Sequence, residues 1–173
     1  CPVITVDANN PYFTVVNGVL FEKDMKTLVV APRSRYYGIY TIPNGVTTIN
    51  PYAMASIYSI DQVIMPNSVV TISDFAFISS NISKVEFSNS VETIGEQAFS
   101  FCNYLTEVVI PDSVTTISNY AFYGCTNLET VTVPASVTSI GYGAFDAGVT
   151  IITTRGSYAD YYAQGYGLTV QYQ

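Results

Sequence analysis

The chain has 173 residues, of which 49% are hydrophobic and 11% are charged, and its formal net charge is −7. Such a composition supports one folded domain with a large core and excludes a disordered chain. Residues 36–154 contain nine carboxylates and one basic residue, Lys84, which excludes nucleic acid as a partner and disfavours docking to an anionic membrane surface. No apolar run approaches the roughly 20 residues that span a bilayer.

The first 39 residues predict the remnant of a repeat followed by a β-meander insert. Ile4-Thr5-Val6 fits the end of an earlier repeat, so we expect further sequence, including any targeting segment, upstream of Cys1. Residues 12–16 and 19–22 flank Asn17-Gly18, the strongest short hairpin signal. Residues 27–30 add a third strand. Cys1 could serve as a lipoprotein anchor, but we do not expect this role, because a strand over residues 4–6 would leave no spacer.

Residues 40–151 repeat one pattern five times. Five isoleucines are separated by 23, 22, 23 and 23 residues: Ile49, Ile72, Ile94, Ile117 and Ile140. A parallel column contains the large apolar residues Met54, Phe77, Phe99, Phe122 and Phe145. Repeats of this length cannot bury their apolar face alone and must stack. We therefore predict a mainly β solenoid of about five coils with parallel strands.

Residues 105–127 illustrate the three sides predicted for each coil. Leu105, Val108 and Ile110 follow the pattern L-x-x-V-x-I, in which the last two side chains point to one side of a strand. Residues 114–117 form a second short strand with β-branched side chains. Residues 119–124 suit a helical turn or a short 3₁₀ segment, with Phe122 in the centre.

Residues 152–173 predict a cap over the last coil. Ser157 is a candidate N-cap for a short helix from residue 158 to 164, ended by Gly165 and Gly167. A final strand from 168 to 172 follows. Such a cap would cover the open edge of the solenoid, which otherwise invites aggregation. All three regions, 1–39, 40–151 and 152–173, are expected to form one continuous solenoid domain.

Two of the three cysteines, Cys102 and Cys125, occupy the same column of adjacent repeats. Stacked coils would bring their backbones about 5 Å apart, a distance that permits a disulfide. Free cysteine is also among the most buried residue types, so two buried thiols in a ladder are the alternative. The spacing of the cysteines fits no metal site.

The copies VVIPDSVTTISNYAFYGCTNLET and VTVPASVTSIGYGAFDAG resemble the leucine-rich repeats of the BspA-like family of bacterial surface proteins. NPYFTVVNGVLFEKDMKTLVVAP is similar to the hairpin insert of that family, and GSYADYYAQGYGL is similar to its closing segment. The third copy departs from the motif, with Ser88 in place of proline. The resemblance implies a secreted or cell-surface protein, often one module of a longer chain, associated with adhesion to host matrix or to other bacteria. It implies no catalytic residues.

The sequence gives little support for an enzyme. Without histidine, neither a Ser-His-Asp nor a Cys-His arrangement can form, and the commonest metal ligand is missing. Glu86 and Glu107, with Lys84 between their rows, could form a carboxylate pair of the kind that glycosidases use. A solvated charge cluster on a sheet face explains the same residues more simply. We predict no cofactor and no metal.

The outward positions of the first strand of each coil form the predicted binding face. One column contains Ile64, Glu86, Val109 and Thr132, and the other contains Gln62, Lys84, Glu107 and Thr130. Tyrosine is abundant, with 15 residues against no tryptophan, and suits contact surfaces. Tyr52, Phe75 and Tyr120 share a column beside the third side and are further candidates.

We therefore expect a surface-exposed module that binds an extracellular protein, such as a host matrix protein or another bacterial surface protein. A passive spacer that displays further domains of the same chain is one alternative. A carbohydrate-binding module that uses Tyr52 or Tyr120 is another.

Overall fold

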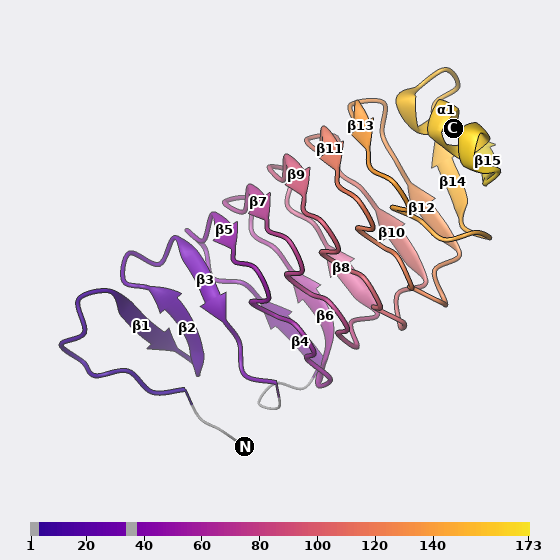
Figure 1. Ribbon diagram of the computed structural model, residues 1–173. Coiled ribbons are helices and arrows are strands. Elements are labelled where there is room, and N and C mark those ends of the chain that lie inside the picture. Colours follow the sequence, from indigo (N-terminus) through magenta and orange to yellow (C-terminus); the bar gives the residue numbers. More distant parts are fainter. Residues whose placement is uncertain (1–3, 34–37) are drawn as a thin grey trace.

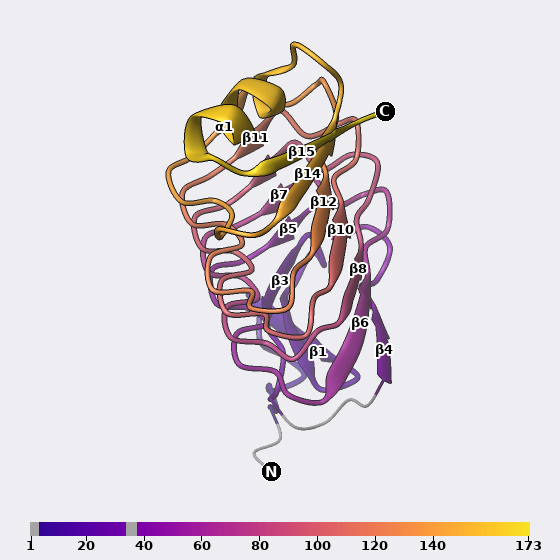
Figure 2. The same ribbon diagram turned by 90° about the vertical axis from the view of Figure 1, so that its right-hand side faces the viewer.

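The computed structural model describes residues 4–33 and 38–173. Cys1 lies outside the described residues, and residues 4–6, which were expected to form a strand close behind it, form none. Figure 1 shows a rod in which the chain winds in successive coils, with the strands in rows along its length. The view turned by 90° shows two of these rows on different sides of the rod and the helix α1 at its C-terminal end (Figure 2). The predicted parallel solenoid is confirmed.

Each coil has three sides. The strands of the first side are β4 (Gly38–Thr41), β6 (Ile60–Ile64), β8 (Lys84–Glu86), β10 (Glu107–Val109), β12 (Thr130–Thr132) and β14 (Thr150–Thr153). The second side contributes two-residue strands, which are β5 (Thr48–Ile49), β7 (Thr71–Ile72), β9 (Thr93–Ile94), β11 (Thr116–Ile117) and β13 (Ser139–Ile140). The third side consists of turns.

The second side keeps the register that the isoleucine column predicts. Ile49 pairs with Ile72, Ile72 with Ile94, Ile94 with Ile117 and Ile117 with Ile140, all in parallel. Four of these isoleucines are fully buried and Ile140 is 7% exposed. Because one residue type recurs at one height in every coil, backbone pairing and apolar burial select the same register.

The first side contains six repeat strands, one more than the five copies aligned in the sequence. The sixth coil begins with β14 and then leaves the pattern, because α1 takes the place of its second and third sides. The isoleucine and phenylalanine columns therefore end one coil before the strands do. Counting columns alone missed this last strand.

The third side is not helical, contrary to the expectation for residues 119–124. Two positions in each coil have a left-handed backbone, such as Phe75 (φ 60) and Ser79 (φ 58). The N–H groups of Phe75, Phe77 and Ser79 donate to the carbonyl oxygens of Glu96, Ala98 and Ser100 of the next coil, over 2.7 to 2.8 Å. A helix would use these donors within its own coil, so the turns form because they also join neighbouring coils.

A stack of phenylalanine rings forms the centre of the rod. Phe77 and Phe99 have ring centroids 4.9 Å apart, Phe99 and Phe122 5.2 Å, and Phe122 and Phe145 5.6 Å, and the rings of each pair are stacked nearly parallel. These side chains are at least 95% buried. Burying one such side chain contributes about 1.5–3 kcal/mol, so the column is a main source of stability.

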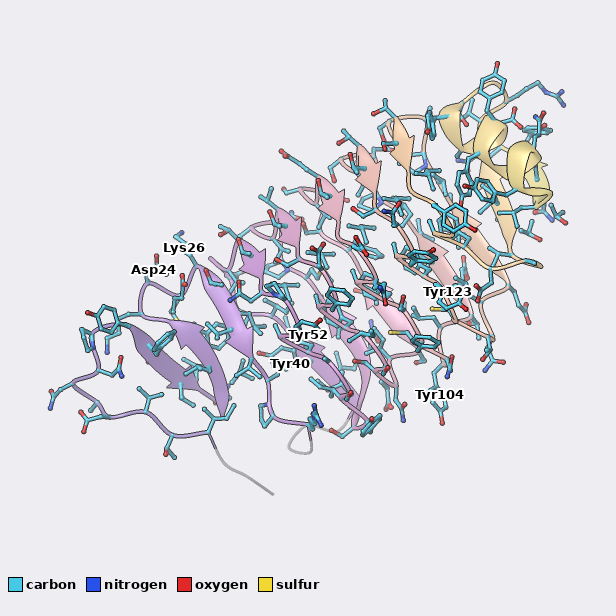
Figure 3. All side chains as sticks on the ribbon, in the orientation of Figure 1. Asp24, Lys26, Tyr40, Tyr52, Tyr104 and Tyr123 are labelled. Carbon is cyan, nitrogen blue, oxygen red and sulfur yellow. The ribbon has the colours of Figure 1, made fainter. Side chains whose placement is uncertain are left out.

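The N-terminal meander is part of the same sheet. It consists of β1 (Phe13–Val16), β2 (Val19–Glu22) and β3 (Thr27–Val30) and confirms the predicted hairpin. β3 also pairs with β5 in parallel, and Leu28 stands opposite Ile49. In the turn before β3, the Asp24 carboxylate accepts a hydrogen bond from the Lys26 N–H over 2.9 Å (Figure 3). The eight-stranded sheet thus runs from β1 to β13.

The C-terminal segment caps the last coil as predicted. The helix α1 (Tyr158–Tyr166) begins after Ser157, whose hydroxyl accepts a hydrogen bond from the Asp160 N–H. It continues through Gly165 and ends at Gly167, which adopts the left-handed conformation of a C-cap. β15 (Thr169–Tyr172) then pairs with β14. Nowhere in residues 4–33 and 38–173 is there a helix long and apolar enough to cross a bilayer.

Cys102 and Cys125 are buried free thiols, so the ladder alternative holds and the disulfide does not form. Their Sγ atoms lie 3.2 Å and 3.1 Å from the carbonyl oxygens of Phe77 and Phe99 in the preceding coils. Each thiol therefore joins two coils by a hydrogen bond rather than by a covalent link.

Candidate functional site

The outward columns of the first side lie as the repeat alignment predicts. Across β6 and β8, Gln62 stands opposite Lys84 and Ile64 opposite Glu86. Across β10 and β12, Glu107 stands opposite Thr130 and Val109 opposite Thr132. All eight side chains are at least partly exposed. The face that they form is mixed in polarity.

The sheet of the first side is interrupted in its middle. β4, β6 and β8 form one sheet, and β10, β12, β14 and β15 form another. At the other junctions the coils are joined by bonds such as Met65 N–H to Glu86 O and Ile110 N–H to Thr132 O. The equivalent bond from Phe87 N–H to Val109 O is missing, and no backbone bond joins β8 to β10 among the described residues.

The second and third sides stay continuous at this junction, because β9 still pairs with β11 and Phe99 N–H still donates to Ala121 O. The interruption is therefore an opening in one face of a closed rod.

Sequence departures on both sides of β8 explain the opening. Only Asn81 separates Ser80 from Ile82, whereas two residues separate Cys102 from Leu105 at the same place in the next coil. The short loop is followed by a bond from Ser83 N–H to Asp61 O of 2.7 Å. After the strand, the Ser88 hydroxyl donates to Val69 O over 2.6 Å. Both ends of β8 are thus bound to the preceding coil.

A bulky side chain adds to the separation. Phe87 occupies a column that is otherwise aliphatic or methionine, and its ring packs edge-on against Phe99 at 5.7 Å. Phe87 and Val85 are only partly buried, whereas Val63, Val108 and Val131, which are equivalent to Val85, are buried.

A cleft of about 500 Å³ lies at the interruption. Ser83, Lys84, Val85, Glu86, Phe87 and Asn89 line it from one side, and Thr106, Glu107, Val109 and Pro111 line it from the other. Four of the eight predicted face residues, Lys84, Glu86, Glu107 and Val109, therefore surround one hollow. Gln62 and Ile64 flank it on one side, and Thr130 and Thr132 on the other.

The charges at the cleft are unevenly paired. Lys84 Nζ lies 2.9 Å from Glu86 Oε1, and Gln62 Nε2 donates to the same oxygen over 2.7 Å. The hydrogen bond from Lys84, its charge and the bond from Gln62 lower the pKa of Glu86. The Glu107 carboxylate makes no hydrogen bond or ion pair with any described residue.

Glu86 itself does not fit the role of a general acid. A general acid in a carboxylate pair needs a raised pKa, whereas the pKa of Glu86 is lowered. No group of three potential metal ligands comes together in the part of the chain that the structure describes. A charged, partly apolar hollow on an open sheet is suited to binding.

The predicted aromatic column belongs to a different face. Tyr52 and Phe75 stack at 4.9 Å on the third side, but Gln97 takes the next place in the column and separates them from Tyr120. Figure 3 labels Tyr52 and Tyr123 at separate places along the rod. These aromatic residues are therefore not brought together with the eight residues of the sheet face.

Sequence analysis missed a second aromatic group at the C-terminal end. Rings contact one another edge-on or stacked in an unbroken series: Phe101, Tyr123, Tyr120, Tyr142, Tyr166 and Tyr162. Because Tyr142 and the residues of α1 do not share the column of Tyr120, the repeat alignment gave no signal for it.

Comparison with known proteins identifies the repeat. Residues 38–151 match the family model of the BspA type leucine rich repeat region, in six copies. A leucine rich cell surface protein from Faecalibacterium prausnitzii is 33% identical with a TM-score of 0.80, and the match covers 88% of this chain and 42% of that chain. A leucine-rich repeat protein from Bacteroides capillosus is 32% identical with a TM-score of 0.58, over 69% of this chain and 96% of that chain.

A further structure shares the fold alone. The pneumococcal vaccine antigen PcpA has a TM-score of 0.80 at 19% identity, and the match covers 96% of this chain and 49% of that chain. This chain thus spans less than half of the length of the Faecalibacterium and pneumococcal chains. No match is found among curated proteins.

Proposed function

Because the chain belongs to the BspA-type leucine-rich-repeat family, we propose that it is a non-catalytic module, exposed at the bacterial surface, that binds an extracellular protein through the first side of the rod. The observation that carries this proposal is the cleft between β8 and β10. It lies between the two sheets of the exposed first side, and its lining combines charged and apolar groups. Adhesion to a host matrix protein or to another bacterial surface protein is the expected role.

Binding to a panel of purified extracellular-matrix proteins, measured by surface plasmon resonance, tests the proposal. The combined variant Gln62→Ala, Lys84→Ala, Glu86→Ala and Glu107→Ala should weaken binding at least tenfold, which corresponds to about 1.4 kcal/mol. A matched control places Thr48→Ala, Thr71→Ala, Thr93→Ala and Thr116→Ala on the second side. Equal affinity of the first variant and the wild type would show that another face binds.

The aromatic series on the third side supports a second candidate, binding of a carbohydrate. Tyr123 and Tyr142 are 44% and 63% exposed and are linked through Tyr120. In this case, glycan-array binding should be lost in Tyr120→Ala and Tyr142→Ala and kept in the first-side variant. Binding to proteins with no glycan signal would remove this candidate.

A further inference from the structure

We propose that the cleft between β8 and β10 binds an arginine side chain of a partner protein, a proposal that rests on the first side being the binding face. The guanidinium would lie between the two strands and contact their free carbonyl oxygens and the Glu107 carboxylate. Arginine is enriched among the residues that dominate protein interfaces, and it acts there by filling a pocket on the partner.

Unpaired backbone groups of both strands surround the cleft. At the intact junctions, residues equivalent to Ser83, Val85, Glu107 and Val109 have their carbonyl oxygens paired with a neighbouring coil, as in Glu129 N–H to Thr106 O and Ile42 N–H to Ile64 O. At the interruption these bonds are missing, and all four residues line the cleft. Carbonyl groups that lack a backbone donor can accept hydrogen bonds from a ligand that donates several.

The width of the opening excludes a whole strand. Cα atoms of β8 and β10 approach one another within 8 Å, whereas a strand inserted between them would require about 9.5 Å, twice the spacing of paired strands. A single flat side chain that enters from a segment lying on the sheet fits the space better. The guanidinium group is planar and carries five N–H donors.

The charge of the lining selects a cation. Lys84 neutralises Glu86, so the unpaired Glu107 carboxylate leaves the cleft with a net negative charge. The second oxygen of Glu86, Oε2, also has no partner among the described residues. A guanidinium can pair with the Glu107 carboxylate in the bidentate manner that a lysine ammonium cannot match, and it can donate a further N–H to Oε2 of Glu86 on the opposite wall.

Apolar groups can bind the stem of the same side chain. Val109 is 56% exposed at the rim and Phe87 is partly exposed. An arginine stem buries its methylene groups against such surfaces while its charged end is hydrogen-bonded. The cleft therefore offers the three kinds of contact that one arginine requires.

The test uses NMR spectra of the whole ¹⁵N-labelled chain and two five-residue probes. One probe is acetyl-Thr-Val-Arg-Val-Thr-amide, whose β-branched residues favour an extended backbone, and the other replaces arginine by its neutral analogue citrulline. We expect the arginine probe to shift the amide signals of Phe87, Thr106 and Val109 and to bind at least fivefold more tightly than the citrulline probe. Equal binding of the two probes, or shifts spread over the acidic surface, would overturn the proposal.

Two variants and a control sharpen the test. Glu107→Gln should weaken binding of the arginine probe at least fivefold, whereas Glu92→Gln, an exposed carboxylate beside the second side, should leave it unchanged. Insertion of a tyrosine after Asn81 combined with Ser88→Pro restores the pattern of the other coils. It should close the cleft, slow hydrogen exchange at Phe87 and Val109, and abolish probe binding.

The outcomes distinguish this proposal from the function on which it rests. If a matrix protein binds the Glu107→Gln variant and the closed variant as tightly as the wild type, the proposal of an arginine site is wrong. The proposal that the first side binds a protein is then not contradicted. If the probe binds the cleft but no matrix protein binds, the site is right and the proposed partner is wrong. If the arginine probe still binds the variant with the closed cleft, the proposed arginine site is wrong, whether or not a matrix protein binds.

Discussion

At the scale of single residues, Ile57, Ser80, Cys102 and Cys125 show how one column accepts different side chains. Ser80 donates from its hydroxyl to Met54 O over 2.6 Å, and the two thiols donate to the equivalent carbonyl groups of Phe77 and Phe99. Burial raises the pKa of Cys125 to about 12 and that of Cys102 well above its ordinary value. The column thus accepts either an apolar side chain such as Ile57 or a small donor, and a donor there stabilises the junction with the preceding coil.

The first prediction concerns these thiols. In the native protein, neither Cys102 nor Cys125 should react with iodoacetamide at pH 8, because the thiolate is the reactive species and both thiols are buried and protonated. Both should react in 8 M urea, and peptide mass spectrometry distinguishes them from Cys1. Since the folded pKa of Cys125 is raised, its contribution to stability is present below pH 9.0 and is lost as the pH rises toward 12. Rapid native alkylation would contradict the burial.

The second prediction compares two glycines. A Cβ on Gly141 would lie 2.4 Å from Asn119 N and 2.6 Å from Ser118 C, both backbone atoms of the preceding coil. Gly141→Ala should therefore destabilise the protein by at least about 1–3 kcal/mol. In α1, a Cβ on Gly165 meets nothing within 4 Å, so Gly165→Ala should stabilise by about 0.5–1 kcal/mol. Urea unfolding measures the free energy of unfolding of both variants. A change of the same sign in the two variants would contradict the prediction.

At the scale of elements, Asp160 connects α1 to its surroundings. Its carboxylate accepts hydrogen bonds from Gly156 N–H at 2.8 Å, Gln164 Nε2 at 2.7 Å and Tyr172 OH at 3.1 Å. One acidic residue in the first turn therefore joins the start of the helix, the next turn and β15. These bonds, with that from Gly156 the largest cause, lower the pKa of Asp160.

The third prediction follows from the sign of this shift. Because the folded pKa lies below the unfolded value of 3.8, Asp160 stabilises the fold above that pH and loses its contribution as the pH falls through the folded value. Asp160→Asn should lower the urea midpoint at pH 7, and the gap to the wild type should narrow below pH 3.8. Asp112→Asn, an exposed carboxylate, is the control. A gap that stays constant down to pH 2.5 would exclude this role.

The elements also show where sequence reasoning succeeds. Strand positions followed from columns that repeat in phase, and Asn17-Gly18 and Ser157 marked the hairpin and the helix N-terminus. The prediction of a helical turn on the third side was wrong, because left-handed conformations at residues such as Phe75 and Tyr120 have no local sequence signal. Pairing with the next coil selects them, and that pairing is not a property of one segment.

At the scale of the whole molecule, five of the six repeat strands of the first side were found, and the candidate face was placed correctly in register. The division of its sheet was not found, although both causes were visible as a shortened loop at Asn81 and Ser88 in place of proline. Each departure looks tolerable alone. Their joint effect appears only when both ends of β8 are seen bound to the same preceding coil.

The fourth prediction concerns the cap. Deletion of residues 155–173 removes β15, one of the two partners of β14, and exposes Phe145, whose ring lies 6.2 Å from that of Tyr162. The open strand edge and apolar end should cause self-association. Size-exclusion chromatography with light scattering should show oligomers for the deletion and a smaller species for Tyr161→Ala, which changes only the outer surface of α1. A deletion variant that keeps the elution of the full chain would show that the cap is dispensable.

The constant height of each column has a consequence for how such a protein can change in evolution. Removing about 23 consecutive residues from anywhere within the coils would shorten the rod by one rung, roughly 4.8 Å, and would rejoin the chain with every remaining side chain facing its former kind of neighbour. Duplication of the same stretch would lengthen the rod by the same step. The length of the rod can therefore change in steps of one coil. Recombination between copies can produce such a change without requiring a new kind of contact.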